Sequence, residues 1–504
     1  MILSKSNFTA TLTCPKAGWL NVHKKEVAAS TSSVMKMGSE VGDLAMNYFG
    51  HYVEVPFGRR MSMVKKTNEF ISVKNSIICE ASFLVDDLFC SCDILKILDF
   101  DKKIVELYEV KSTTKIKDYH KMDIAFQVNV LTKSGYIVKK AGIILVNKDY
   151  EYKKNLAISK LFKVEDVTEE VSLICNDIDD KIAFVRSILD SEEEPTCCLS
   201  ETCHNPYDCS YFDYCSGGTN DMSIFSLEGI TFKKKIEFFN NGITSFCDVV
   251  KEKLKNPSFN ISERALMQIK VALGEAPEVF DKEKVSEFLN TFKFPLYFLD
   301  YETIMDPVPK HKGIHPYEQV PFQFSLHMLT IDGTLTHEEF LAKASEDPRY
   351  ASIKKLISSV GSEGTILAYN SSFERTVIKT LAEQYPKYKE ELMNIYDRIE
   401  DLMIPFQKCW VYKKSFNGSY SIKKVLPGLF PGDPSLDYHS LDAVQNGTMA
   451  MNAYRSLPSL KKKEAEYLRY RLLRYCELDT FAMVKIFYYL RDKVNEEEKT
   501  IEIS

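Results

Sequence analysis

The 504-residue sequence lacks any apolar run near the ~18 residues that a membrane-spanning helix needs, which argues against an integral membrane protein. Its first stretch, Met1 to Cys14, lacks the apolar centre and the small-residue cleavage site of a secretory signal. Internal repeats and low-complexity tracts are also missing, which argues against a fibrous protein. No GxxxxGK(S/T) phosphate-binding loop occurs, so the chain brings no ATP-driven motor of its own. We therefore expect a cytoplasmic globular protein with no membrane partner.

The composition is that of a folded protein with several domains. Apolar residues make up 45% and charged residues 27% of the chain, both close to globular averages. At roughly 150 residues per domain, the length suggests about three domains. The net charge of −6, from 65 basic and 71 acidic residues, does not by itself indicate a nucleic-acid partner. It leaves room for a local basic groove, because the charge is unevenly distributed along the chain.

Hydrophobic periodicity divides the chain into three blocks. In the first, alternation and β-branched residues predict strands around a helix, and a cysteine-rich loop closes the block. Helical spacing predicts a helical connector in the second block, and alternating strands and helices predict an α/β sheet in the third. The predicted domains are residues 1–218, 219–292 and 293–504. The predicted elements are strands at 77–84, 88–98, 104–111, 141–146, 294–300, 322–331 and 365–369, and helices at 6–23, 38–49, 119–134, 373–384 and 461–493.

Acidic side chains gather at three places in the third block. Asp300 and Glu302 lie at positions i and i+2 where the apolar strand pattern ends, so both carboxylates project from one face. Glu374 starts a helix directly after a strand, and Tyr475 and Asp479 are four residues apart on one helix face. Adjacent carboxylates repel each other unless a cation lies between them, and an oxygen-liganded divalent metal is the natural partner. The set predicts two metal ions that activate water for phosphodiester hydrolysis.

This arrangement resembles the DnaQ-like 3′→5′ exonucleases, which carry Asp-x-Glu after a strand, then Asn-x-x-Phe-acid, then Tyr-x-x-x-Asp. The resemblance implies an RNase H-like mixed sheet in which Asp300, Glu302, Glu374 and Asp479 bind Mg²⁺ or Mn²⁺. It also implies that Tyr475 orients the attacking water. The third acid is usually Asp in that superfamily, and Glu374 departs from the pattern. The longer side chain is expected to shift the second metal and lower activity.

Each of these motifs is common by itself on strand ends and helix surfaces, and only their order and context favour a site. The neighbouring segments 316–317 and 321–325 resemble a bacterial family of uncharacterised proteins that carries the same exonuclease-like domain.

A second set of polar residues lies in the first block. Glu109 and Lys111 flank one residue of a strand and therefore point to the same side, and Asp93 lies on the preceding strand. Two carboxylates there would bind Mg²⁺ or Mn²⁺, and the lysine would hold the attacking water and offset charge on the phosphate. A surface Glu/Lys pair on an edge strand is the simpler alternative.

The pattern Asp…Glu-x-Lys…Gln, completed by Gln127 on the following helix, resembles the RecB-like branch of the PD-(D/E)xK nucleases. The resemblance implies that Asp93 and Glu109 bind metal while Lys111 and Gln127 support catalysis. Glu40 falls where that branch often has a metal-binding residue on an N-terminal helix, usually His. The branch often has Tyr four residues after the Gln, and this chain has Leu there.

Thirteen cysteines are many for a protein of a reducing compartment, where clustered cysteines are better read as metal ligands than as disulfides. Cys203, Cys209 and Cys215 are evenly spaced, and Cys14 lies near the start of the chain. Four such thiolates resemble the iron–sulfur RecB-like nucleases, including CRISPR-associated exonucleases and AddB-type proteins, which implies a mainly structural [4Fe-4S] cluster. A zinc site is the alternative. The neighbouring pair at 197–198 would be substitute ligands, and the other seven cysteines are expected to be small buried residues.

The sequence thus predicts a two-site, metal-dependent DNA nuclease, acting on single-stranded ends in DNA repair or in defence against foreign DNA. A helicase or another repair or defence protein would be its partner. Two alternatives remain open. One is an RNA-processing exonuclease, and the other is a nucleic-acid-binding module in which one nuclease site has degenerated.

Overall fold

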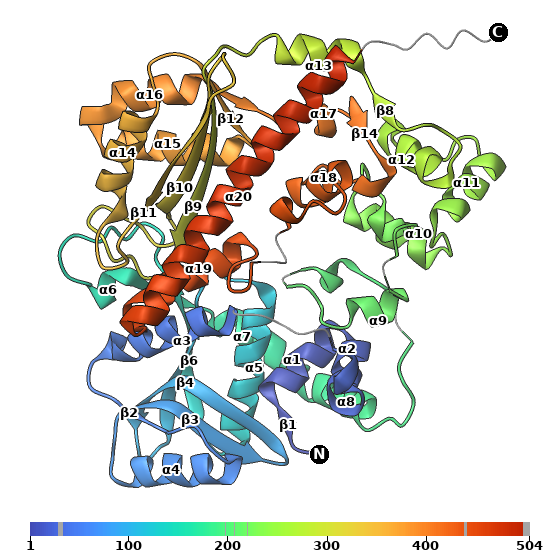
Figure 1. Ribbon diagram of the computed structural model, residues 1–504. Coiled ribbons are helices and arrows are strands. Elements are labelled where there is room, and N and C mark those ends of the chain that lie inside the picture. The colour runs from blue at the N-terminus through green and yellow to red at the C-terminus, as the bar shows by residue number, and fades with distance from the viewer. Residues whose placement is uncertain (29–33, 197, 206, 219, 438–440, 497–504) are drawn as a thin grey trace. The chain divides into compact units, whose positions relative to one another are not determined.

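The computed structural model describes residues 1–28, 34–196, 198–205, 207–218, 220–437 and 441–496 (Figure 1). The chain divides into two compact units. The first unit comprises Met1–Thr219 and Asp306–Tyr317, and the second comprises Asn220–Met305 and Glu318–Ser504. Both units combine sheets with helices, so the fold is mixed α/β. Within the described part of the chain, we find no helix with the length and apolar character needed to cross a bilayer.

A seven-stranded mixed sheet forms the centre of the first unit, with the order β2-β3-β4-β5-β6-β7 and β1 paired to β4. Neighbours β3, β4 and β5 are antiparallel, whereas β5 and β6 run parallel and are connected by helix α5. Its strands are β1 (Leu3–Ser4), β2 (Val53–Glu54), β3 (Ile77–Val85), β4 (Leu88–Asp99), β5 (Ile104–Lys111), β6 (Ile137–Val146) and β7 (Phe162–Asp166).

Alternating side chains of this sheet enter two hydrophobic cores, one on each face. Leu95 and Leu107 pack with helix α5, whereas their neighbours Ile94 and Tyr108 pack with helix α3 on the opposite face. This alternation follows from the two-residue period of a strand, and it explains the apolar pattern of the sequence. The helices are α1 (Lys5–Thr13), α2 (Pro15–His23), α3 (Val34–Ala45), α4 (Arg60–Ser72), α5 (Asp118–Lys133), α6 (Ile158–Leu161), α7 (Thr168–Cys175), α8 (Ile178–Leu189) and α9 (Phe212–Ser216).

The main sheet of the second unit has the order β11-β10-β9-β12-β13, in which β11, β10 and β9 are antiparallel while β12 and β13 run parallel to β9. The central strand is longer than the sequence suggests, since it continues past Glu302 to Met305. Pairing with β12 stops at Phe298, so this edge of β9 is open where the acidic residues begin. Its strands are β9 (Leu296–Met305), β10 (Gln319–Leu329), β11 (Leu335–Leu341), β12 (Thr365–Ala368) and β13 (Ile399–Asp401).

Helices cover both faces of this sheet. The odd-numbered residues Tyr297, Leu299 and Tyr301 share a core with helices α14, α15 and α16. The long helix α20 lies along β9 and β10 in Figure 1, and its Phe487 contacts Phe298 with ring centroids 6.0 Å apart. These helices are α14 (Pro348–Ser359), α15 (Ser372–Gln384), α16 (Lys389–Asp397), α17 (Ile404–Gln407), α18 (Ile422–Leu429), α19 (Gly447–Ser456) and α20 (Lys462–Asn495).

The expected connector is mainly helical and belongs to the second compact unit. Apolar residues of its helices form a small core around Phe238, Phe246 and Ile269. A two-stranded sheet pairs β8 at its end with β14. Its elements are α10 (Phe232–Asn240), α11 (Phe246–Lys255), α12 (Glu263–Leu273), β8 (Val279–Phe280) and α13 (Lys282–Leu289), and β14 spans Val411–Tyr412.

Candidate active sites

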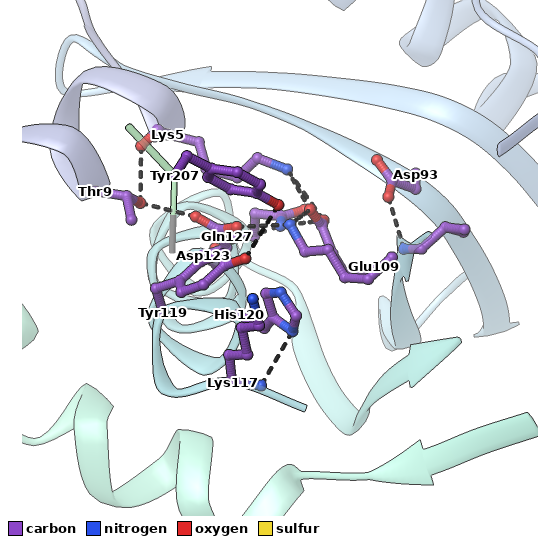
Figure 2. A network of polar contacts seen from close by, with 12 residues as sticks. Lys5, Thr9, Asp93, Glu109, Lys117, Tyr119, His120, Asp123, Gln127 and Tyr207 are labelled. Carbon is purple, nitrogen blue, oxygen red and sulfur yellow. Dashed lines mark hydrogen bonds and ion pairs between the residues drawn. The ribbon is translucent and has the colours of Figure 1, made fainter. Parts of the chain in front are cut away.

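Glu109 is the centre of the polar network in the first unit (Figure 2). Its side chain is almost completely buried on β5, and three side chains donate to it. Lys5 Nζ lies 2.8 and 3.0 Å from the two carboxylate oxygens, and Lys111 Nζ lies 2.9 Å from Oε1. Gln127 Nε2 donates to Oε2 at 2.7 Å. The structure therefore brings together Glu109, Lys111 and Gln127, as the sequence pattern predicts, and adds Lys5.

Asp123 extends this network to helices α1 and α5. Lys111 Nζ lies 2.7 Å from its Oδ2, and the Thr9 hydroxyl donates to Oδ1 at 2.8 Å. Asp123 and Gln127 are one turn apart on α5, and both are buried, so the same helix face presents them to the sheet. Lys111 is thus held between two carboxylates. Lys5 and Thr9 were missed by the sequence analysis because no local motif connects α1 to a strand a hundred residues away.

Asp93 lies next to Glu109 and has a different electrostatic environment. Its Oδ2 accepts a hydrogen bond of 2.7 Å from the backbone N–H of Val110. Burial, together with the neighbouring Glu109 charge, raises the pKa of Asp93 to about 7. Burial also opposes ionisation of Glu109, but the ammonium groups of Lys5 and Lys111 outweigh it and lower the pKa of Glu109 to about 2. The two adjacent acids therefore hold protons over very different pH ranges.

A cavity of about 520 Å³ opens beside Asp93 and Lys111. Glu80 and Glu54 also line it, as do residues of helix α3, among them Asp43. Burial raises the pKa of Glu80, and the positive φ of 55° at this residue marks an irregularity in β3 where it faces β4. Glu80 and Asp43 are therefore further acids of this cavity that the sequence motifs did not single out.

The structure places Glu40 apart from the lining of this cavity. Glu40 is exposed, and its carboxylate lies 3.9 Å from the Lys310 ammonium group. The face of α3 that does line the cavity carries Ser39, Gly42, Asp43 and Met46, which follow the spacing of one helix face. Asp43 is therefore better placed than Glu40 to contribute a carboxylate from this helix.

Three carboxylates meet in the second unit. Asp300 and Glu302 of β9 and Asp479 of α20 each offer an oxygen, and these atoms all lie within 4.8 Å of one another. The two strand residues share the face that α20 covers, because they are two positions apart. Cys476 of the same helix contacts Asp300, with Sγ 3.5 Å from Oδ2. Residues nearly 180 positions apart in the chain thus form one cluster, as the sequence predicts.

Hydrogen bonds to β10 fix helix α20 in the position that this cluster requires. The Thr480 hydroxyl lies 2.7 Å from the Ser325 hydroxyl and 2.8 Å from His327 Nδ1. Gln323 Nε2 donates to the carbonyl oxygen of Leu472 at 2.7 Å. The segment 321–325, conspicuous in the sequence, therefore anchors the helix, and Thr480 is the anchoring partner that the motif search missed.

Asp300 and Glu302 of this cluster hold their protons unusually strongly. Burial, followed by repulsion from Asp479, raises the pKa of Glu302 to about 8. The same two causes, together with the Glu302 and Glu374 charges, raise the pKa of Asp300 well above its ordinary value. Each acid opposes the ionisation of the others because they are close and shielded from water. A divalent cation would remove this repulsion.

Glu374 and Tyr475 complete the predicted set. Glu374 begins helix α15 and is buried, and burial raises its pKa to about 8. It stands outside the group of three acids that lie within 4.8 Å, although its charge raises the pKa values of Asp300 and Glu302. Burial, with the Asp479 charge, raises the pKa of Tyr475 far above its ordinary value, so its phenol stays a hydrogen-bond donor.

Asp401 positions the turn that carries Glu374. Its carboxylate, at the end of β13, accepts backbone hydrogen bonds from Asn370 at 3.0 Å, Ser371 at 3.0 Å and Met403 at 2.9 Å. Asn370 has a positive φ of 71°, so this turn has an unusual conformation that the three bonds support. The sequence analysis missed Asp401, whose only local signal is an acidic residue after a short strand.

Another group of potential metal ligands lies at the far end of the same sheet. His337 and Glu339 of β11 and Glu477 of α20 offer atoms within 4.8 Å of one another. However, Glu477 is ion-paired with Arg474, and Glu339 is exposed. We do not assign a metal to this group.

The four predicted cluster cysteines lie in one neighbourhood of the first unit. Cys14 separates α1 from α2, and its Sγ accepts from the Ala17 N–H at 3.4 Å. Burial raises the pKa of Cys215 to about 11, opposed by Lys16 and reinforced by charge on the other three thiols. Burial and charge on two of these thiols likewise raise the pKa of Cys209. The sulfur atoms are therefore close enough to influence one another.

The spacing of these thiols bears on the ion that they would hold. In a tetrahedral zinc site with Zn–S bonds of ≈ 2.3 Å, the sulfur atoms are ~3.8 Å apart. Among the described residues, the groups with ligand atoms within 4.8 Å contain no cysteine. Cys197 lies outside the described residues, Cys198 is exposed, and Cys247 is exposed rather than buried as expected.

Residues 297–421 match a family described as a domain of unknown function, DUF2779. This range includes Asp300, Glu302 and Glu374, and it ends before Tyr475 and Asp479. The match therefore covers the β9–β13 sheet and stops short of helix α20.

The chain is also similar to curated proteins of mycoplasmas. Uncharacterized protein MG366 of Mycoplasma genitalium is 28% identical over 238 residues, covering 42% of this chain and 35% of that protein. Uncharacterized protein UU173 of Ureaplasma parvum is 25% identical over 270 residues, covering 49% and 37%. The MG366 homolog of Mycoplasma pneumoniae is 26% identical over 220 residues, covering 40% and 32%. The chain thus spans about a third of the length of the curated relatives that it matches.

Proposed function

We propose that this chain is a metal-dependent nuclease that hydrolyses phosphodiester bonds of DNA, acting at single-stranded ends, with one site in each unit. The observation that carries the proposal is the meeting of Asp300, Glu302 and Asp479, whose oxygens lie within 4.8 Å of one another. Buried carboxylates at this distance repel one another strongly, and such an arrangement is costly unless it serves to bind cations.

The second unit would hold its metal through Asp300, Glu302, Asp479 and Glu374. A bound pair of Mg²⁺ or Mn²⁺ ions supplies a deprotonated water and stabilises the charge on the leaving oxygen. Tyr475, whose phenol stays protonated, would donate a hydrogen bond to the attacking water. The mixed sheet, with the acids on its central strand and on a covering helix, supports the assignment of an RNase H-like, DnaQ-like exonuclease domain.

The first unit would hold a metal through Asp93 and Glu109, with Glu80 or Asp43 as further oxygen ligands. Lys111 stays protonated between Glu109 and Asp123 and offsets charge that develops on a phosphate oxygen. Gln127 fixes the orientation of the Glu109 carboxylate through its 2.7 Å hydrogen bond. These roles support a PD-(D/E)xK nuclease domain of the RecB-like kind.

We propose that Cys14, Cys203, Cys209 and Cys215 hold a [4Fe-4S] cluster in this domain, with Zn²⁺ as the alternative. The cluster would tie the beginning of the domain to its end. Iron and acid-labile sulfide measured on anaerobically purified protein, with Cys209→Ser as the comparison, test this assignment. Stoichiometric zinc in a colourless protein would contradict it.

Separate inactivation of the two sites tests the nuclease. We expect Lys111→Ala and Asp300→Ala each to lower metal-dependent cleavage of an end-labelled DNA strand ~100-fold or more at its own site. The double variant should be inactive. Lys133→Ala is a matched control, since this lysine lies exposed near the end of α5. Undiminished cleavage by the double variant would overturn the proposal for both sites.

The same assay distinguishes the remaining candidates. Faster degradation of single-stranded RNA than of DNA would favour an RNA-processing exonuclease, since the DnaQ-like fold also serves that chemistry. Tight binding with cleavage lost in only one single variant would indicate that the other site has degenerated into a nucleic-acid-binding module. The choice between DNA repair and defence against foreign DNA depends on the substrate class, and so does a helicase partner. No residue of the described chain decides either of them.

A further inference from the structure

Phe57 is the most exposed large apolar side chain of the described residues, with 98% of its surface accessible. It lies in the loop between β2 and α4, preceded by Pro56 and followed by Gly58. Singly exposed apolar side chains are common on protein surfaces, so the exposure of Phe57 matters only through the place where this side chain lies.

The relevant feature is the position of Phe57 at two cavities. It lines the 520 Å³ cavity that contains Asp93 and Lys111, and it also lines a second cavity of about 440 Å³. The two cavities share Phe57, Met63, Glu80 and Asp93. The exposed ring therefore stands where two hollows meet, directly beside the candidate metal ligands of the first unit.

The two cavities differ in charge. The charged residues that line the first cavity are four acids and one lysine, namely Asp43, Glu54, Glu80, Asp93 and Lys111. The second is lined by Lys5 and Arg60 in addition to the shared acids. Arg60 is held over the Phe89 ring at 5.4 Å, and α4 starts there without an acidic residue in its first turn. In the second cavity Lys5 and Arg60 balance the two shared acids, whereas the first adds Asp43 and Glu54 to them. An anionic group is therefore better tolerated in the second cavity, and a metal ion in the first.

We propose that a single nucleic-acid strand lies across both cavities, with a base stacked on Phe57 and the adjoining phosphate between Lys5 and Arg60. This inference rests on the proposed nuclease function and names the substrate-positioning residues of its first site. A strand in this position places the next phosphodiester at Asp93, where the metal would bind. Single-stranded nucleic acid is the occupant because it alone combines an unpaired flat ring with regularly spaced phosphates.

Steady-state kinetics of the full chain in an Asp300→Asn background, which silences the other site, test the proposal. We expect Phe57→Ala to raise KM for a labelled 20-nucleotide oligothymidylate about tenfold, which corresponds to ~1.4 kcal/mol, the scale of one lost base stack. kcat should change less than about twofold. Phe57→Leu, which keeps an apolar side chain but cannot stack, should behave like Phe57→Ala.

Two further measurements separate stacking from a general surface effect. Phe57→Trp should keep the parent KM, and its added indole fluorescence should be quenched by the oligonucleotide. An oligonucleotide with one abasic position should bind more weakly to the parent but not to Phe57→Ala. Phe184→Ala is the matched control, since Phe184 is 46% exposed on α8 and lines neither cavity.

The outcomes distinguish this inference from the proposed function. If the Asp300→Asn parent cuts the oligonucleotide while Phe57→Ala and Phe57→Leu retain its KM, the stacking role is wrong and the nuclease remains. A different result would be that the Asp300→Asn parent does not cut the oligonucleotide and that the oligonucleotide does not quench the fluorescence of the Phe57→Trp variant. In that case the nuclease proposal for this site fails, and the stacking role fails with it.

Discussion

The two candidate sites differ in how the charge of neighbouring carboxylates is balanced. In the first unit, Glu109 is surrounded by protein cations, because the ammonium groups of Lys5 and Lys111 both lie within 3.0 Å of it. In the second, Asp300, Glu302 and Asp479 lie together, and the pKa values of Asp300 and Glu302 rise instead. In the first site ion pairs balance the charge of Glu109, although its neighbour Asp93 has a pKa raised to about 7. In the second site bound protons neutralise Asp300 and Glu302.

This contrast determines what a metal ion must displace in each place. At the first site a metal ion would share the Glu109 carboxylate with Lys5 and Lys111, whose positive charges oppose its binding. At the second site it competes with protons, so binding there depends on pH. Sites with similar ligands are therefore expected to respond differently to substitution and to solution conditions.

The largest expected effect comes from neutralising one acid in each site. Glu109→Gln leaves two buried ammonium groups without their shared carboxylate, and breaking such a buried ion pair costs ~3–5 kcal/mol in free energy of unfolding. Glu302→Gln removes repulsion from Asp479 and should leave the metal-free stability unchanged or slightly higher. Hydrogen exchange resolved by peptide, with and without urea, measures each unit separately.

If Glu302→Gln destabilises its unit as much as Glu109→Gln does, the distinction between the two sites is wrong. Glu106→Gln is a useful control on β5, because this acid pairs with Lys96 near the surface. Its loss should cost less than about 1 kcal/mol.

A smaller effect concerns pH. The pKa values of Glu302 and Glu374 are about 8 in the folded unit, against 4.5 for an ordinary Glu. Between these values the folded unit binds more protons than the unfolded chain, so its metal-free stability falls as the pH rises from 4.5 to 8. Mn²⁺ replaces the protons, so the gain in Tm on adding Mn²⁺ should grow by ~5 °C or more between pH 5.5 and 8.

Differential scanning calorimetry in EDTA and in Mn²⁺ measures this gain for the transition of the second unit. Asp300→Asn should abolish most of the gain. A gain in Tm that stays constant across this pH range would show that the acids are already ionised without metal.

The smallest expected effect concerns the turn before α15. Asp401→Asn removes the charge that accepts three backbone hydrogen bonds, and should lower the stability of the second unit by ~1 kcal/mol. Because Glu374 is then held less firmly, the Mn²⁺ concentration needed for half-maximal cleavage should rise about threefold, with kcat nearly unchanged. Asp397→Asn, on the exposed end of α16, is the control.

Elements with strong periodicity could be predicted from the sequence. Alternation placed β4 and β5 close to their observed bounds, and the spacing of Tyr475 and Asp479 placed both on one face of α20. The end of β9 was placed too early, since the acidic residues looked like a strand terminus. The strand continues because β10 pairs with it as far as Met305.

The candidate site residues were predictable where a short motif carries them and not where the contact is long-range. Asp93, Glu109 and Lys111 lie on neighbouring strands, so strand geometry brings them together. Lys5 joins them only through the packing of α1, which no local pattern encodes. Glu40 lies outside the cavity lining because a different face of α3 meets the sheet. Counting back about one helical turn from Met46 leads to Asp43, on the face that does line the cavity.

Helix α1 joins two chemically distinct centres of the first unit. It begins at Lys5, which contacts Glu109, and ends beside Cys14. The nine residues of this helix span ~13 Å along its axis. Because one helix carries both residues, any displacement of its end at Cys14 would also shift the Lys5 ammonium group relative to Glu109.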